Sequence, residues 1–226
     1  MEGRLGVLVG ASTIGNEESK LLDFLGQQDV YKIAVDGGIS FFIKNNIVPD
    51  FWLGDMDSTR EKSIENINKD SSFDLDDFLA KIKKKELSPI KDDTDMALAV
   101  EDAVANGCEE IVIFGGLGGA RMSHTFANVQ LVHRFARKGI SIRMYSETNT
   151  VQVIVNGSLQ LPKKDNGFIS IFALTDKAKG VSIKNLFYEY EGDLTNDVAL
   201  GVSNEFCGKE ACVSVSDGAL LVIFED

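Results

Sequence analysis

The first two thirds of the chain alternate short apolar runs with longer amphipathic segments. Buried strands are predicted at residues 5–9, 32–35, 51–53, 111–114 and Ser141–Tyr145, several of them followed by glycine or aspartate. Apolar residues recur at helical spacing at 17–25, Asp95–Ala105 and 124–138, and more weakly at 75–82. Strands that alternate with helices favour a mostly parallel sheet covered by helices.

The pattern changes near residue 147, beyond which short β-like runs follow one another without a helix of comparable length. Strands are predicted at 151–155, Phe168–Ala173, 181–183, 211–215 and 220–224, and Asp217-Gly218 predicts a hairpin between the last two. We expect an α/β fold with two domains. Residues 1–146 form the mostly parallel sheet with flanking helices, and residues 147–226 form a small antiparallel β-sandwich or barrel.

Composition places the chain among ordinary globular proteins. Of its 226 residues, 44% are hydrophobic and 26% are charged. No apolar run approaches the roughly 20 residues that a membrane span needs, and no signal peptide is visible, so a cytoplasmic location is expected. Three cysteines are too few for a disulfide framework, and with two histidines a cysteine–histidine zinc site is not expected.

The net charge argues against a nucleic-acid partner. Lysine and arginine number 23 against 35 acidic residues, which gives −12, and nucleic-acid binding requires clustered positive charge. The one basic run, Lys83-Lys84-Lys85, is interpreted as the solvated face of a helix. An anionic substrate would therefore need another source of neutralisation, usually a divalent cation.

Two acidic segments could supply ligands for such a cation. The sequence Gly-Asp-Met-Asp-Ser at 54–58 follows a predicted strand and places Asp55 and Asp57 two residues apart. The sequence Lys-Asp-Asp-Thr-Asp at 91–95 directly precedes the clearest helix. A turn and an acidic helix cap explain each segment taken alone. If both face the same edge of the sheet, four carboxylates gather there, and a metal would relieve their repulsion.

Glycine-rich segments follow other predicted strands. The longest, at 115–124, joins a strand to a helix and carries Arg121, which can fork onto a phosphate, and His124, either a base or a satisfied residue of the first helical turn. Shorter ones are Gly10-Ala11-Ser12 and Asp36-Gly37-Gly38. Each alone is explained by a turn. Together, such loops lie on one edge of a parallel sheet and predict a nucleotide site.

These segments, together with Gly-Val-Ser-Asn-Glu at 201–205 and the final predicted hairpin, resemble the thiamine pyrophosphokinase (thiamine diphosphokinase) family in order and approximate spacing. The resemblance covers nearly the whole chain. It implies an N-terminal α/β ATP-binding catalytic domain, a C-terminal thiamine-binding β-sandwich and a homodimer. It also implies Mg²⁺-dependent transfer of a diphosphate group from ATP to the hydroxyl of thiamine, with AMP as the other product.

By the same resemblance, individual positions acquire expected roles. The metal and phosphate cluster would be Asp55, Asp57 and Asp95, which with Arg121 would be the catalytic residues. The ATP site would be lined by Asp36, Gly37, Ser58, Asp92, Thr94, Arg121, Ser123 and His124. Thiamine would be approached by Ser203, Asn204 and Phe206, the last standing where some members place a stacking tryptophan.

One position departs from the family pattern. The family usually reads Arg-x-Asp-His where this chain has Arg121, Met122, Ser123 and His124. Serine is a poorer Mg²⁺ ligand than aspartate, or it serves only as a helix cap. Two other functions therefore stay open: a non-catalytic thiamine or nucleotide sensor, and another nucleotide-dependent phosphotransferase on the same fold.

Overall fold

The computed structural model describes residues 3–54, 74–86, 93–118 and 122–225. The chain separates into two compact units. The first unit comprises Met1–Asn128 with Tyr145–Glu147, and the second comprises Val129–Met144 with Thr148–Asp226. The division falls inside a long helix, α6 (Met122–Ala136), and before the last residue of the strand β6 (Ser141–Tyr145).

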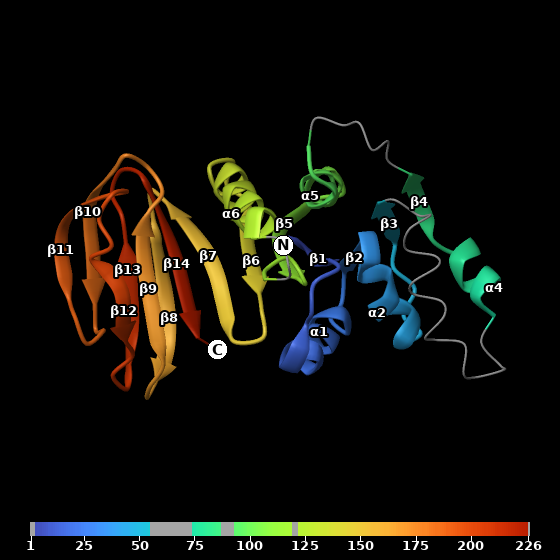
Figure 1. Cartoon of the computed structure of the whole chain (residues 1–226), viewed down its shortest axis with the longest axis horizontal. Coiled ribbons are helices and arrows are strands. Elements are labelled where there is room, and N and C mark those ends of the chain that lie inside the picture. The colour runs from blue at the N-terminus through green and yellow to red at the C-terminus, as the bar shows by residue number, and fades with distance from the viewer. Residues whose placement is uncertain (1–2, 55–73, 87–92, 119–121, 226) are drawn as a thin grey trace. The chain divides into compact units, whose positions relative to one another are not determined.

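A parallel sheet forms the centre of the first unit (Figure 1). Its strands lie in the order β5-β1-β2-β3-β4. Each neighbouring pair is parallel. The strands are β1 (Arg4–Val9), β2 (Val30–Val35), β3 (Phe51–Gly54), β4 (Lys83–Glu86) and β5 (Cys108–Phe114). The mostly parallel sheet predicted from the alternating pattern is confirmed.

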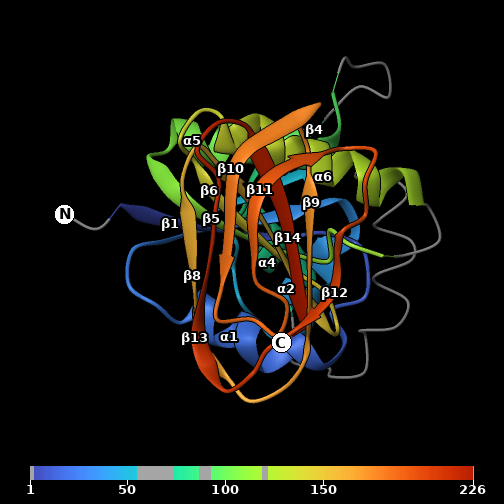
Figure 2. The ribbon, with the colours of Figure 1, turned by 90° about the vertical axis from the view of Figure 1, so that its left-hand side faces the viewer.

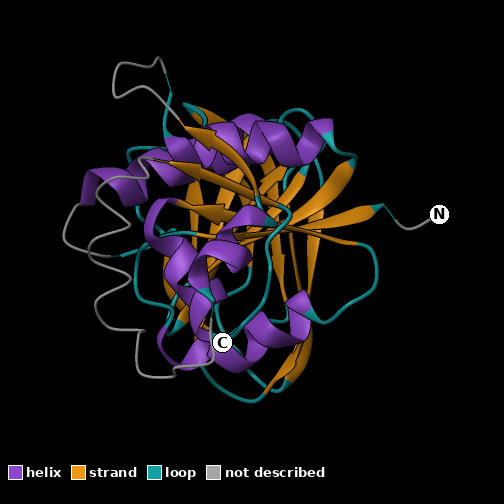
Figure 3. Ribbon diagram, turned by 90° about the vertical axis from the view of Figure 1, so that its right-hand side faces the viewer, coloured by secondary structure: helices purple, strands orange, loops and turns teal. Residues whose placement is uncertain are grey.

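Helices cover both faces of these strands, as Figures 1 and 3 show. One side carries α1 (Glu18–Leu25), α2 (Ile39–Lys44) and α4 (Leu75–Ala80), and the other carries α5 (Asp95–Ala105). Two single 3₁₀ turns, η1 (Gly15–Glu17) and η2 (Asp36–Gly38), precede α1 and α2. Apolar side chains on both faces explain why the strands read as continuous hydrophobic runs.

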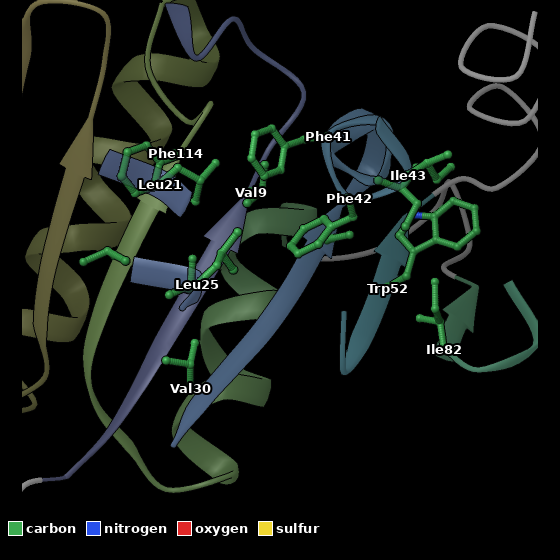
Figure 4. Close-up of a cluster of buried hydrophobic side chains, with 14 of the residues drawn as sticks. Val9, Leu21, Leu25, Val30, Phe41, Phe42, Ile43, Trp52, Ile82 and Phe114 are labelled. Atoms are coloured by element: carbon green, nitrogen blue, oxygen red, sulfur yellow. The ribbon is translucent and has the colours of Figure 1, made fainter. Parts of the chain in front are cut away.

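The side with α1 and α2 encloses a continuous apolar core (Figure 4). Val7 and Val9 of β1 point into it together with Leu21 of α1 and Phe42 of α2, all of them fully shielded from solvent. Trp52 of β3 completes the cluster beside Ile43. The short helix α2 was not predicted, because its sequence Ile-Ser-Phe-Phe-Ile-Lys is apolar nearly all round and shows no helical period.

The second unit is a β-sandwich (Figure 2). One layer has the order β12-β9-β14-β7-β6 and the other the order β11-β10-β13-β8. Its strands are β7 (Asn149–Val155), β8 (Ser158–Lys164), β9 (Phe168–Ala173), β10 (Lys177–Lys184), β11 (Tyr190–Thr195), β12 (Gly201–Glu205), β13 (Lys209–Ser214) and β14 (Ala219–Glu225). The pairings of β7 to β14 within these layers are antiparallel. The predicted antiparallel sandwich is confirmed.

The predicted hairpin at Asp217-Gly218 is wrong. β13 pairs with β8 and β10, whereas β14 pairs with β7 and β9, so the turn carries the chain from one layer to the other. The amide of Gly218 donates to Asn156 Oδ1 at 2.8 Å, which fixes the turn against another connection between the layers. An Asp-Gly turn is a local signal and does not choose the partner of the strand that follows it.

The basic run is also corrected. Lys83, Lys84 and Lys85 belong to β4, the edge strand of the parallel sheet, rather than to a helix. Charged side chains on an exposed edge oppose pairing with another chain, which is a common reason for lysine on edge strands.

Among the described residues, no helix is both long enough and apolar enough to cross a bilayer.

Candidate active site

A cavity of about 490 Å³ opens at the carboxyl ends of β1, β2 and β5 in the first unit. The segments that follow these strands line it, together with the start of α5 and the first turns of α6. Between β1 and β5 the strand order reverses, since β2 to β4 lie on one side of β1 and β5 on the other. Open α/β sheets bind their ligands at this switch point, and the volume suits a small-molecule ligand.

Glycine lets two of these segments lie directly against each other. The amide of Gly10 donates to the carbonyl of Phe114 at 2.8 Å, and the amide of Ser12 donates to the carbonyl of Gly115 at 3.1 Å. A Cβ atom on Gly10 would lie 2.6 Å from the Gly115 oxygen. The floor of the cavity therefore consists of main chain, which a ligand can approach closely.

Asp36 enters the cavity from a strained turn after β2. It has φ of +49°, a left-handed conformation that non-glycine residues seldom adopt. One hydrogen bond holds the turn, and two glycines leave room for it. The indole of Trp52 donates to the Asp36 carbonyl at 3.2 Å. A Cβ on Gly54 would lie 2.3 Å from Asp36 Oδ1, and one on Gly38 would lie 1.8 Å from the carbonyl oxygen of Val9.

The N-terminus of α5 forms another wall. Thr94 caps the helix, because its hydroxyl accepts a hydrogen bond from the Ala97 amide at 3.2 Å. The carboxylate of Asp93 accepts from the Thr94 amide at 2.9 Å. Thr94 and Asp95 both line the cavity. A capped helix start presents positive potential to this space, which favours bound anions.

The glycine-rich segment after β5 is held by side chains of α6. Asn128 is buried, and its amide donates to the carbonyl of Gly116 at 2.6 Å. The hydroxyl of Thr125 accepts from the Gly118 amide at 3.0 Å. We did not assign these positioning roles from the sequence. The spacing of the two residues by three, directly after a glycine-rich segment, is the signal that could have suggested them.

The structure brings part of the predicted nucleotide site together. Asp36, Thr94, Asp95 and His124 line the cavity, and Gly37 lies in the turn beside it. Ser123 is exposed within α6 and does not line the cavity, and its position inside the helix is not that of an N-cap. The remaining predicted residues, Asp55, Asp57, Ser58, Asp92 and Arg121, lie outside the described residues.

In the second unit, Asn204 is a buried residue whose side chain makes three hydrogen bonds to the main chain. Its oxygen accepts from the amides of Tyr188 and Glu205, both at 2.9 Å, and its nitrogen donates to the Tyr188 carbonyl at 2.7 Å. The preceding Ser203 has φ of +56° and lies where the register of β12 against β9 shifts. Its amide donates to Ser170 Oγ at 3.1 Å. Such bulges redirect side chains locally.

Phe206 is part of the sandwich core rather than an exposed ring. Its side chain is only 5% exposed and packs in the apolar cluster with Leu186 and Leu161. The Lys164 ammonium lies 5.5 Å from the ring centroid. The sequence around Phe206 is polar and therefore does not predict that the ring packs in the core. Burial disfavours the predicted stacking of Phe206 on thiamine, because no open ring face is available.

A second cavity, of about 350 Å³, lies in the second unit. Tyr188, Glu189 and Tyr190 line one part of it, and Leu200, Val202 and Asn204 line another. Tyr188 and Leu200 are strongly exposed, at 63% and 61%. Aromatic rings beside a carboxylate offer a suitable surface for an organic cation.

The clearest pKa shifts in the first unit lie away from the cavity. Burial, together with the hydrogen bond that its hydroxyl donates to Asp102 at 2.8 Å, raises the pKa of Tyr31. Burial raises the pKa of the Cys108 thiol to about 11. Both residues lie at the amino ends of their strands, opposite to the cavity. They stay protonated at neutral pH and therefore support the fold rather than acid–base chemistry.

The donors in the cavity fit a metal that is bound jointly with a ligand. Within residues 3–54, 74–86, 93–118 and 122–225, no three His, Cys, Asp or Glu side chains form a group that could hold a metal ion. Asp36 and Asp95 nevertheless both line the same cavity. Mg²⁺ keeps several waters and commonly binds through one or two carboxylates plus substrate phosphates. The donor set therefore suits Mg²⁺ carried by a polyphosphate.

The chain is an α/β protein with a cavity at the switch point of a parallel sheet and an attached β-sandwich. Residues 23–144 match the family model described as thiamin pyrophosphokinase, catalytic domain. The match covers more than half of the chain, and the chain belongs to the thiamin pyrophosphokinase family.

Relatives agree along the full length. The thiamine pyrophosphokinase of Bacillus subtilis is 27% identical over 213 residues, which cover 92% of this chain and 94% of the relative. Its crystal structure superimposes with a TM-score of 0.83 and covers 98% of this chain and 99% of that one at 22% identity. The enzyme from Candida albicans gives a TM-score of 0.76 at 12% identity, with 98% and 89% covered. These structural likenesses confirm the fold.

Proposed function

We propose that the cavity at the carboxyl ends of β1, β2 and β5 binds ATP and is the place where the chain acts as a thiamine diphosphokinase. The reaction follows from the family: the hydroxyl oxygen of thiamine attacks the β-phosphorus of ATP, and the bond from that phosphorus to the oxygen shared with the α-phosphate breaks. Thiamine diphosphate and AMP result, and the hydroxyl proton is lost. The observation that carries the proposal is the cavity itself, built from strand-end main chain at a switch point.

The phosphates fit the side of the cavity that is lined by Gly10, Gly115 and Gly116. There the glycines leave the main chain uncovered, and the capped start of α5 adds positive potential. Such a surface can bind a polyanion although the whole chain carries −12. Positioning and charge stabilisation are the main tasks in phosphoryl transfer, since the protein contributes little covalent chemistry.

Mg²⁺ is the expected metal, and Asp95 and Asp36 are the described residues that would hold it. When bound, the ion neutralises charge on the phosphates. Asp55 and Asp57, predicted as further ligands, follow β3 in the sequence and stay proposed ligands. Without the ion, the cavity carboxylates and the triphosphate would repel each other. ATP binding should therefore depend strongly on the divalent cation.

Thiamine fits the second cavity best. Thiamine carries a positive thiazolium ring, and Tyr188, Tyr190 and Glu189 supply aromatic faces and a negative charge. Asn204 also lines this cavity, and its hydrogen bonds hold the main chain at Tyr188. Ser203 stays a proposed contact. Phe206 is assigned to the core instead.

A homodimer is the proposed assembly. Phe187, Tyr188, Leu200 and Val202 are all more than 40% exposed, and three of them line the second cavity. Contiguous exposed apolar side chains mark interaction surfaces, and a two-fold pairing would let one such surface cover itself. Sedimentation of wild type and Leu200→Asp tests this: the variant should be monomeric, and two identical sedimentation profiles would exclude this surface. A cytoplasmic location stays a prediction.

The reaction is tested by incubating the purified chain with ATP, thiamine and Mg²⁺ and separating the products. AMP and thiamine diphosphate should form in equal amounts. ADP with thiamine monophosphate would indicate another phosphotransferase. Thiamine or ATP that binds measurably by calorimetry without any product would indicate a sensor.

A further inference from the structure

Trp52 is the one tryptophan of the chain, and its side chain does not line the nucleotide cavity. It lies in β3 opposite Ala34 of β2 and is only 4% exposed. Its ring packs in the apolar cluster between the sheet and α2 (Figure 4). The indole N–H nevertheless leaves that cluster and donates to the carbonyl oxygen of Asp36 at 3.2 Å.

That carbonyl belongs to a residue in a costly conformation. With φ of +49°, Asp36 is left-handed, and a non-glycine residue persists there only when its surroundings hold it. Gly54 leaves room for Asp36, because a Cβ at Gly54 would lie 2.9 Å from Asp36 Cα and 3.0 Å from its amide nitrogen. The indole is the side-chain donor that fixes the orientation of the peptide group after Asp36.

We propose that Trp52 is a positioning residue of the nucleotide site: its indole N–H holds the Asp36 turn so that the Asp36 side chain faces the bound nucleotide. The proposal rests on the proposed function, in that ATP is taken as the ligand of this cavity. Trp52 acts through Asp36 and does not touch the ligand, because Asp36 lines the cavity and Trp52 does not.

The alternative is that Trp52 only fills the core. A single-atom change in its ring distinguishes this packing role from the proposed positioning role. Replacing Trp52 by β-(3-benzothienyl)alanine, introduced at a reassigned codon, keeps the size of the ring but puts sulfur in place of N–H. We expect the Kd for ATP·Mg²⁺, measured by calorimetry, to rise by about three- to ten-fold, because a turn that is no longer held must be ordered when the nucleotide binds, at a cost comparable to one hydrogen bond. The KM for thiamine and the unfolding temperature should change little.

Two further variants make the test specific. Asp36→Asn removes the charge while keeping a side chain that tolerates the left-handed conformation, and in that background the benzothienyl replacement should raise the ATP Kd by less than two-fold. Non-additivity of this kind shows that two residues act together. Ile82→Val trims the same core cluster without touching a hydrogen bond. It should lower the unfolding temperature and leave ATP binding unchanged.

An unchanged ATP Kd in the benzothienyl protein would overturn the proposal, as would an equal rise in Kd with and without the Asp36 substitution. Neither result would affect the proposed function, which fails instead if the wild-type chain neither binds ATP·Mg²⁺ nor forms thiamine diphosphate.

Discussion

Two residues with predicted ligand roles share a left-handed backbone conformation, but different interactions hold each of them. Asp36 in the first unit and Ser203 in the second have φ of +49° and +56°. The Asp36 turn follows a parallel strand and is fixed by Trp52 from the neighbouring strand. Ser203 lies inside an edge strand, at a register shift, and is held by Ser170 of the adjacent strand. The cavity of the first unit lies at strand ends, whereas that of the second borders an irregular stretch of a strand.

This difference decides how each unit should respond to substitution. Side chains at the carboxyl ends of parallel strands can change while the strands themselves stay paired. In the second unit, the same residues hold the sandwich together and shape the cavity. Changes there should cost stability first and ligand binding second.

The largest effect is expected for Phe206→Ala. Removing a ring from the closed core of the sandwich should lower the free energy of unfolding by about 3–5 kcal/mol. The buried position of the ring is the reason. Urea denaturation followed by circular dichroism measures it, and Phe206→Leu serves as the milder control. In Phe206→Leu the KM for thiamine should stay within two-fold of wild type. A ten-fold higher KM at unchanged stability would instead restore the stacking role.

In the first unit, Asp95→Asn should leave stability nearly unchanged and affect turnover. Loss of an acidic residue from the start of α5 costs about 0.3–1 kcal/mol. Loss of a carboxylate that would hold Mg²⁺ should reduce AMP formation by about 100-fold or more, comparable to removing one main electrostatic contact to a transition state. Initial rates across a Mg²⁺ titration measure the effect. Asp23→Asn, an exposed residue of α1, gives the same charge change and should retain full activity.

The contrast between the units also explains what the sequence could predict. The strands and the glycines after β1, β2 and β5 were visible, because each strand of a parallel sheet is a separate apolar run and all carboxyl ends meet at one edge. The cavity of the first unit follows from that rule. The role proposed for Trp52 does not, because the indole on β3 finds its acceptor in the turn after the neighbouring strand β2, and only the folded register places it there.

In the second unit, the missed features depend on partner choice. Strand β8 contains Pro162 and two lysines, and β12 is polar, so neither shows a clear apolar alternation. Asp217-Gly218 marks a real turn, but the turn connects strands of two different layers and does not form a hairpin. The burial of Phe206 depends on which strands cover it. Strand partners and burial of this kind are set by non-local pairing, which the local pattern of apolar and polar residues does not reveal.

A smaller effect is expected for Asn204→Ala. The change would leave the amide and carbonyl of Tyr188 and the amide of Glu205 without the partner that they have now. Tyr188 and Glu205 are themselves exposed residues, which limits the loss to about 2 kcal/mol of unfolding free energy. Chemical denaturation measures it. Asn204→Asp keeps the acceptor but sets a buried charge and a second oxygen against the Tyr188 carbonyl, so it should also be destabilising. An alanine variant as stable as wild type would show that water replaces the side chain.

The smallest effect on stability is expected for Ser203→Gly, which tests the comparison most directly. Glycine adopts the left-handed conformation freely but has more freedom to lose on folding, a term of about 0.5–1 kcal/mol. These opposing terms should leave the unfolding free energy within about 0.5 kcal/mol of wild type. Ser203→Ala, which lacks the hydroxyl but keeps the strain, should be slightly less stable than Ser203→Gly.

The KM for thiamine in the same two variants shows whether Ser203 acts through its hydroxyl or through the shape of the bulge. If the hydroxyl touches thiamine, both variants should raise KM equally. If only the bulge matters, both should bind thiamine as wild type does, because the main chain keeps its course in each. A rise in KM confined to Ser203→Gly would mean that the strained serine keeps the cavity in shape, as Trp52 is proposed to do for Asp36.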